Sequence, residues 1–130
     1  MEIDKMSDAQ LERYVTTIML DIGVPAHLKG YHYLREAIIL SSRDMETVSS
    51  VTKLLYPEVA KHFKTTNQKV ERAIRNAIEV SWERGNVETF EKLFGYSTES
   101  GKGRPTNSEY IARIADMMRL ELQEDAEKLG

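Results

Sequence analysis

The chain of 130 residues contains no cysteine and only three prolines. Without cysteine it can form no disulfide framework and no thiolate nucleophile, and this composition is compatible with the reducing cytoplasm in which we expect the protein. No apolar run approaches the length of a membrane span. The first ten residues are acidic and polar, so we do not expect them to be a secretory signal peptide. Hydrophobic residues make up 41% of the chain and charged residues 30%, so an ordinary globular domain is expected.

Apolar residues recur at helical spacing along almost the whole chain, and no segment has the alternation of a strand. Capping residues, prolines and glycines mark the boundaries between the helical segments. The expected helices cover about residues 7–23, 25–43, 44–56, 57–64, 66–84, 86–94 and 106–121, with charged, frayed residues after the last. This pattern predicts an all-α fold, a compact domain of six or seven helices over residues 1–130.

Residues 57–84 have the pattern of a short helix, a tight turn and a long helix. Pro57 suits a first helical position because its missing N–H is not needed there. Lys64 and Thr65 supply the turn. Thr65 and Gln68 have capping-box form, so the second helix is expected to begin near residue 66. The segment therefore predicts a helix-turn-helix, although an ordinary helical hairpin has the same spacing.

The longer of these two helices has one apolar face and one polar face. The apolar face is formed by Val70, Ala73, Ile74, Ala77, Ile78 and Ser81. The opposite face carries Gln68, Arg72, Arg75 and Glu79, flanked by Lys69 and Asn76. In the major groove Arg and Lys bond to guanine, and Asn and Gln bond to adenine. The polar face is therefore suited to reading DNA.

Positive charge is concentrated in this region, although the whole chain has a net charge of −3. Between positions 61 and 75 the basic residues are Lys61, Lys64, Lys69, Arg72 and Arg75, against the single acid Glu71. A basic stripe on an acidic protein indicates a surface for phosphate. The alternative is a solvated helix face that is stabilised by Glu–Arg pairs.

No other segment carries recognisable chemistry. Residues 95–105 are expected to form a loop, and their sequence SGKG lacks the spacing and the preceding strand of a phosphate loop. The histidines show no paired metal spacing, and no acid pair lies in an apolar pocket. His27 and Lys29 begin a helix whose N–H groups could meet a DNA phosphate. We therefore expect no catalytic residue, no metal site and no cofactor.

Four uninterrupted runs carry a family resemblance: DIGVPAHLKGYHYLREAI (21–38), VTKLLYPEVAKHFKTTNQKVERAIRNAIEVSWERGN (51–86), LFGY (93–96) and KGRPTNSEYIARIADMMRLE (102–121). They closely resemble the C-terminal effector domains of stage 0 sporulation protein A, the response regulator that commits spore-forming bacteria to sporulation. The resemblance implies a six-helix transcription factor domain that activates some genes and represses others from short operator boxes. It also implies a preceding receiver domain. No receiver pocket occurs in these residues, so DNA binding without phosphorylation control is expected.

The resemblance, together with the side-chain chemistry described above, indicates roles for individual residues. Lys69, Glu71 and Arg72 are expected to read bases in the major groove. Contacts to phosphate, or support of the reading residues, are expected from His27, Lys29, Lys64, Thr66, Gln68, Arg75 and Asn76.

A second surface is implied for residues 85–98, which resemble a region that contacts the housekeeping sigma subunit of RNA polymerase. Glu88, Glu91 and Phe94 are the expected contacts, since acidic and aromatic side chains suit a basic partner helix. The alternative is that Phe90 and Phe94 are core residues, which we favour for at least one of them.

The expected partners are thus duplex DNA, the sigma subunit and the receiver domain, with no membrane. We expect a monomer in solution that can pair head to tail on repeated sites. A rival interpretation from another class is a helical protein-interaction domain with no DNA function.

Overall fold

The computed structural model describes residues 2–97 and 100–129, and within them it contains helices and no strand. This confirms the all-α prediction. The elements are the 3-10 turn η1 (Ile3–Lys5), α1 (Asp8–Asp21), α2 (Lys29–Arg43), α3 (Glu46–Ser49), the π-helical turn η2 (Val51–Leu55), α4 (Tyr56–His62), α5 (Asn67–Arg84), α6 (Val87–Phe94) and α7 (Asn107–Leu129).

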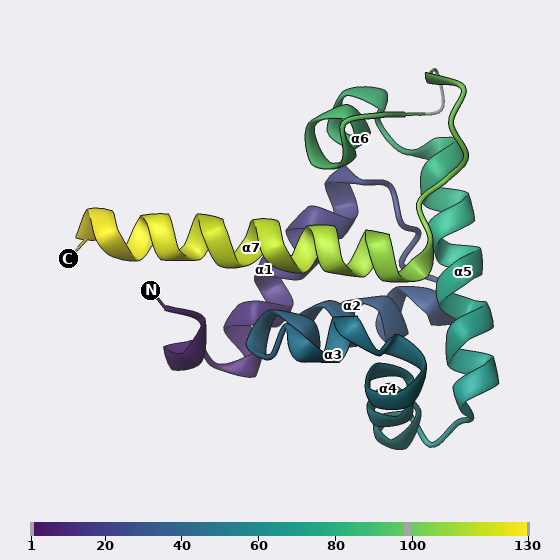
Figure 1. Ribbon diagram of the computed structural model, residues 1–130, viewed down its shortest axis with the longest axis horizontal. Helices are drawn as coiled ribbons and strands as arrows, with labels where there is room; N and C mark the ends of the chain where they lie inside the picture. The colour runs from purple at the N-terminus through teal and green to yellow at the C-terminus, as the bar shows by residue number, and fades with distance from the viewer. Residues whose placement is uncertain (1, 98–99, 130) are drawn as a thin grey trace.

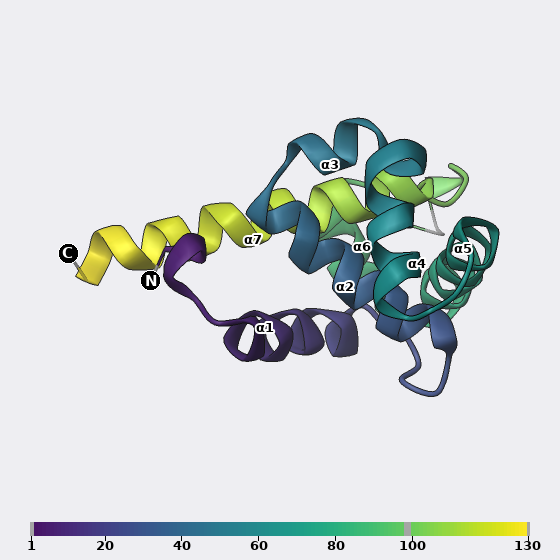
Figure 2. The same ribbon diagram turned by 90° about the horizontal axis from the view of Figure 1, so that it is seen from below.

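Helix α5 forms one edge of the molecule, with α4 at its N-terminal end and α6 beyond its C-terminal end (Figure 1). Helix α7 begins beside α5 and runs away from it, toward the side where both chain ends lie. The view from below shows the same relation, with α2 between α1 and α7 (Figure 2). Helix α2 makes the most extensive contacts of any helix, packing on α5, α7 and α1.

The core lies around α2, in which eight of the 15 residues are buried. Its fully buried side chains meet those of α5 and α7 in one cluster that includes Leu34, Ile38, Ile74, Ile78, Ile111, Ile114 and Met118. Gly30 allows the closest approach between α2 and α5. A Cβ atom at this position would lie 2.0 Å from the carbonyl oxygen of Ala73. The position of α5 is therefore set by backbone contact as well as by side chains.

The predicted helix starts at Ser7, Asn86 and Thr106 are confirmed. The Ser7 hydroxyl accepts from the N–H of Gln10 at 3.1 Å, and the Gln10 side chain accepts from the N–H of Ser7 at 2.8 Å. Asn86 caps α6 by accepting from two backbone N–H groups. Each cap supplies acceptors for N–H groups that the first turn leaves unpaired.

Two predicted boundaries in the first half of the chain were wrong. Helix α2 begins at Lys29 instead of Pro25, because residues 25–28 form a turn closed by a bond from the N–H of Leu28 to the carbonyl of Pro25. The helix expected over residues 44–56 is interrupted at Ser50, whose φ of −143° and ψ of 69° lie outside the helical region. The hydroxyls of Thr47 and Ser49 bond back to carbonyls three residues earlier, and such local bonds compete with helix continuation.

The last helix is longer than predicted, since α7 continues to Leu129 where fraying after residue 121 was expected. Leu122 extends the apolar stripe of α7 and is buried in the core cluster. The neighbouring Arg119 donates to the carbonyl of Ser42 at the end of α2, and η1 packs against α7. Tertiary contacts therefore stabilise a segment whose sequence is mainly charged.

Candidate nucleic-acid interface

The turn between α4 and α5 is tight and is built from backbone hydrogen bonds. The N–H of Thr65 donates to the carbonyl of Ala60 at 2.9 Å, and the N–H of Lys64 donates to that of Lys61 at 3.4 Å. This pair of bonds is a Schellman motif, which requires a left-handed residue after the helix. Lys64 is that residue, with φ of 55°. The predicted turn is confirmed, and a lysine occupies the position that usually holds glycine.

The N-terminus of α5 is capped by Thr66, which corrects the predicted capping box of Thr65 and Gln68. The Thr66 hydroxyl accepts from the N–H of Lys69 at 3.2 Å. The backbone explains the difference of one residue. The N–H of Thr65 is already used to close the turn on α4, so it is not available to a capping box. Thr66 has the extended backbone of an N-cap residue, with φ of −106° and ψ of 157°.

The two faces of α5 follow the predicted division. Val70, Ile74, Ala77, Ile78 and Ser81 are buried, and Ala73 is half-buried beneath Gly30. Gln68, Lys69, Arg72, Arg75 and Asn76 are exposed. Helix α5 forms an edge of the described part of the molecule, and no other labelled helix lies on its outer side in either view (Figures 1 and 2).

Glu71 differs from the other predicted base-reading residues, because it is half-buried at the margin of the exposed face. Its carboxylate lies 3.6 Å from Nε of Arg75, one turn along the helix. Its backbone carbonyl also accepts a hydrogen bond from the side chain of Asn107 at 3.2 Å. The carboxylate and the backbone carbonyl of Glu71 thus both have partners within the protein. Lys69 and Arg72 are exposed, so their side chains can reach a ligand.

The other residues expected near phosphate surround this face. Lys64 and Thr66 are exposed at the start of α5. His27 and Lys29 are exposed just before and at the first turn of α2. The contact between Gly30 and Ala73 brings that turn against the middle of α5. The structure therefore gathers these polar and basic side chains and N–H groups along one edge.

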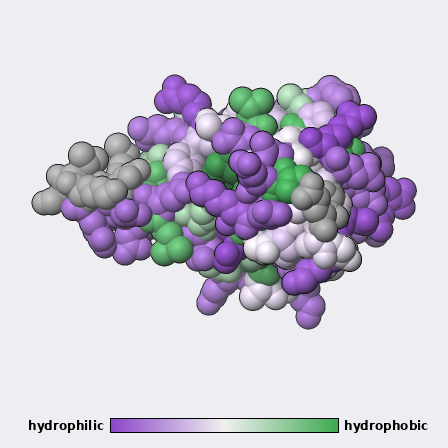
Figure 3. Space-filling model, turned by 90° about the horizontal axis from the view of Figure 1, so that it is seen from above, coloured by the Kyte–Doolittle hydropathy of each residue, from purple (hydrophilic) through white to green (hydrophobic). Residues whose placement is uncertain are grey.

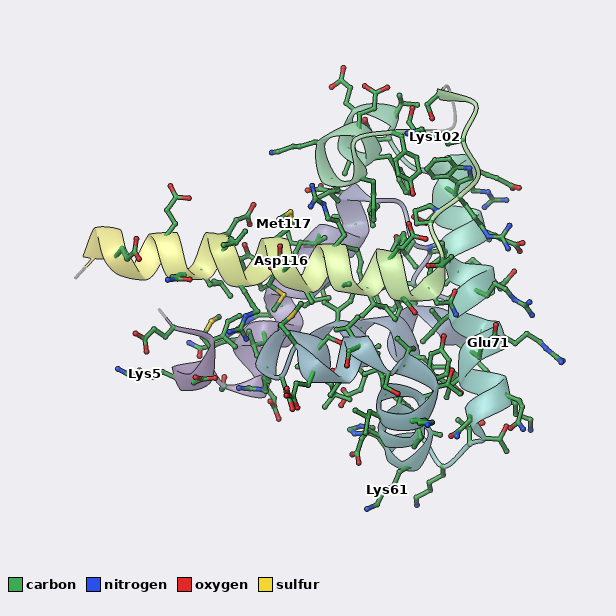
Figure 4. All side chains as sticks on the ribbon, viewed as in Figure 1. Lys5, Lys61, Glu71, Lys102, Asp116 and Met117 are labelled. Carbon is green, nitrogen blue, oxygen red and sulfur yellow. The ribbon has the colours of Figure 1, made fainter. Side chains whose placement is uncertain are left out.

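Residues from the loop before α7 also lie near α5, through contacts that no local sequence pattern contains. Nη2 of Arg104 lies 3.0 Å from Oε1 of Glu79. Nζ of Lys102 lies 5.3 Å from the ring centre of Tyr96. Figure 4 places Lys102 at one end of α5 and Lys61 near the other, so basic side chains occur at both ends of the exposed helix.

The α6 surface is polar, with an aromatic cluster beneath it. Glu88 and Glu91 are exposed, and Glu91 accepts from the Ser97 hydroxyl at 3.2 Å. Phe90 is buried in the core, whereas Phe94 is half-buried and stacks on it at 5.6 Å between ring centres. One of the two phenylalanines is therefore a core residue, as we favoured.

Trp82 of α5 joins the same cluster, with ring centres 5.1 Å from Phe90 and 5.8 Å from Tyr96. From the side of α6 and the loop the surface is mostly hydrophilic, with apolar groups in smaller patches (Figure 3). Thr98, the last residue of the segment compared with the sigma-contacting region, lies outside the described residues.

An all-helical fold whose edge helix follows a tight turn and presents exposed Arg, Lys, Asn and Gln is consistent with the helix-turn-helix class of DNA-binding domains. Residues 15–118 match the family described as Sporulation initiation factor Spo0A C terminal. The match covers most of the chain, so the chain belongs to this family. It is a family of response-regulator effector domains that bind DNA and regulate transcription at the initiation of sporulation, and it is not a family of enzymes. Among residues 2–97 and 100–129, no helix is long and apolar enough to cross a membrane.

Proposed function

We propose that this domain binds specific duplex DNA by inserting the exposed face of α5 into the major groove of a short operator box. The observation that carries the proposal is the coincidence of three features on one helix: a tight preceding turn, an uncovered outer face, and a row of cationic and amide side chains. The alternative, an ordinary solvated helix face, would explain the charged side chains but not the tight turn or the amide side chains.

We assign base reading to Arg72, Lys69 and Glu71. The exposed Arg72 has the planar fork that bonds the O6 and N7 atoms of guanine, and Lys69 can reach the same acceptors as a point charge. Glu71 can accept from the amino group of cytosine, and its pairing with Arg75 holds its carboxylate at the margin of the face.

The surrounding residues have the chemistry of phosphate contacts, which position a protein without reading sequence. We assign this role, or the support of the reading residues, to His27, Lys29, Lys64, Thr66, Gln68, Arg75 and Asn76. The N–H groups at the starts of α2 and α5 add partial positive charge beside these side chains.

In the cell we propose that the domain controls entry into sporulation, activating some promoters and repressing others. We propose that it acts next to a receiver domain and contacts the sigma subunit of RNA polymerase through Glu88, Glu91 and Phe94. The exposed carboxylates and the half-buried aromatic ring of α6 support this second role, because such a surface complements a basic helix.

The first experiment is equilibrium binding to a labelled duplex that carries the family's operator box, against a scrambled duplex, at two salt concentrations. We expect preference for the box, and weaker binding to both duplexes at higher salt. Equal, weak binding to both duplexes would reduce the surface to a nonspecific basic patch. No salt-dependent binding at all would favour the protein-interaction alternative.

Replacing Arg72 with alanine tests the base-reading assignment. We expect the variant to lose about 1–3 kcal/mol of binding free energy on the operator box and much less on the scrambled duplex. Arg13→Ala is the matched control, since Arg13 is an exposed arginine on α1. Equal weakening on both duplexes would assign Arg72 to phosphate instead.

A further inference from the structure

The side chain of Asn107 connects the two helices of the turn motif. Asn107 is the first residue of α7 and is half-buried. Its amide nitrogen donates to the hydroxyl of Tyr56, the first residue of α4, at 2.9 Å. The same nitrogen donates to the carbonyl of Glu71, in the second turn of α5, at 3.2 Å. Both N–H groups of one carboxamide can therefore be used, one on each helix.

Asn107 is itself held firmly. The preceding Thr106 accepts from the N–H of Glu109 at 3.2 Å, and its own N–H donates to the Glu109 carboxylate at 3.5 Å. This capping box fixes the first turn of α7. Three residues after Asn107, the fully buried Tyr110 hydroxyl lies 2.8 Å from that of Ser81 on α5.

The first turn of α7 is thus hydrogen-bonded to α5 at two points. Asn107 hydrogen-bonds to Glu71, and Tyr110 hydrogen-bonds to Ser81. Glu71 and Ser81 are ten residues apart on α5, which corresponds to about 15 Å along the helix axis. The Ser81 hydroxyl in turn donates a hydrogen bond to the carbonyl of Ile22 at the end of α1. Two separated points fix both the direction of α5 and its rotation about its own axis.

The point at Glu71 is the one next to the proposed reading residues. Glu71 immediately precedes Arg72, and its carboxylate pairs with Arg75. A rotation of α5 by about 20° would move its side-chain ends by about 2 Å, which is enough to break hydrogen bonds to base edges.

The Tyr56 hydroxyl is an uncharged hydrogen-bond partner of Asn107. Burial raises the pKa of Tyr56, with the Glu71 carboxylate acting in the same direction and Asn107 and Arg75 against it.

We propose that Asn107 is a positioning residue for sequence reading: it sets the rotation of α5 against α4 and α7, and so aligns Glu71 and Arg72 with the bases. This inference rests on the proposed function of α5. It assigns a role in specificity to a residue whose described contacts lie within the protein.

The test compares Asn107→Ala, Asn107→Asp and the control Gln10→Ala on the operator and scrambled duplexes. Gln10→Ala removes a comparable side-chain bond in the capping box at the start of α1, and that end of α1 lies away from α5 (Figure 1). For Asn107→Ala we expect the ratio of operator to scrambled affinity to fall about tenfold, the equivalent of one lost base contact. For Gln10→Ala we expect the ratio to remain at the wild-type value.

Asn107→Asp separates positioning from stability. The aspartate cannot donate to the Tyr56 hydroxyl as Asn107 does, but it can accept a hydrogen bond from that hydroxyl instead. Its charge also suits the first turn of a helix, so we expect the melting temperature to be kept. It cannot donate to the Glu71 carbonyl, so we expect the affinity ratio to fall as for alanine. The ratio is the decisive quantity, because the added negative charge weakens binding to both duplexes alike.

A wild-type ratio in both Asn107 variants would overturn the proposal. If the wild-type protein itself had no operator preference, the proposed function would fail, and amide hydrogen exchange of the DNA-free protein would decide the positioning role. We expect faster exchange over residues 70–76 in Asn107→Ala than in Gln10→Ala. Equal exchange in these two variants would refute the role of Asn107 independently of DNA.

Discussion

Lys64 adopts a backbone conformation that favours glycine, at the turn before the proposed recognition helix. A non-glycine residue in the left-handed region costs about 1–2 kcal/mol. The side chain is exposed and its charge suits a neighbouring phosphate. A substitution at Lys64 can therefore change the stability of the turn and the binding of DNA by separate amounts.

For Lys64→Gly we expect the free energy of unfolding to stay the same or rise by up to about 1 kcal/mol, since relief of strain offsets the greater freedom of glycine in the unfolded chain. We expect the slope of log affinity against log salt concentration to decrease in magnitude by about one. Denaturant unfolding and binding titrations measure the two effects. Lys5→Ala, on the side of the molecule away from α5 (Figure 4), should leave the slope unchanged. An unaltered slope in Lys64→Gly would exclude a phosphate contact.

Single residues were predictable from sequence where their partners are close in the chain. The caps at Ser7, Asn86 and Thr106 bond within three residues, so a short pattern contains the whole interaction. The positions bonded by Asn107 are 51 and 36 residues away, and no local pattern contains them. The shift of the α5 cap from Thr65 to Thr66 likewise depends on a turn closed onto the preceding helix.

At the scale of elements, periodicity and stop residues were sufficient to predict the extents of α1, α5 and α6 to within about two residues, because their ends carry clear caps or glycines. They failed where side-chain bonds to the backbone or tertiary contacts override the helical period. Hydroxyl groups interrupt the segment between α2 and α4, and burial of Leu122 extends α7 through charged sequence. The polar face of α5 was predicted correctly because amphipathicity is a property of one helix alone.

The crossing of α2 and α5 depends on Gly30, and Gly30→Ala tests it. Alanine normally favours a helix over glycine by about 1 kcal/mol. Here the new Cβ would lie 2.0 Å from a backbone oxygen of α5, so the helices must separate. We expect a net loss of at least about 1–3 kcal/mol of stability, measured by denaturant unfolding. Gly103→Ala is the control, since open space surrounds that position. Equal stability of the two variants would contradict the close packing.

Across the whole molecule, the two proposed binding surfaces lie at different places: the outer face of α5, and α6 beyond its far end (Figure 1). The first is basic within a chain of net charge −3, and the second is acidic. Opposite charge separates the two classes of partner, since nucleic acid is repelled from the α6 surface and a basic protein helix from α5. The ring contact between Trp82 and Phe90 joins the two helices, and periodicity within a single helix does not contain such a contact, so sequence patterns could suggest each surface but not their relation.

Glu88→Lys should weaken binding to the isolated sigma subunit at least about threefold at low salt, because it reverses a charge in the proposed contact, while operator affinity is unchanged. Pull-down or titration with the sigma subunit measures the first effect. Glu46→Lys is matched, since both acids are exposed in the first turn of a helix. The same sigma affinity in both variants would remove Glu88 from the proposed contact.

The aromatic cluster between α5 and α6 has an optical consequence. Trp82 is the single tryptophan of the chain, and it lies on α5 in edge contact with Phe90. Its emission spectrum therefore originates from one site, at the junction of the helix that is proposed to meet DNA and the helix that is proposed to meet polymerase. The protein contains its own fluorescent reporter of that junction, and separation of α5 from α6 can be followed without attaching a dye.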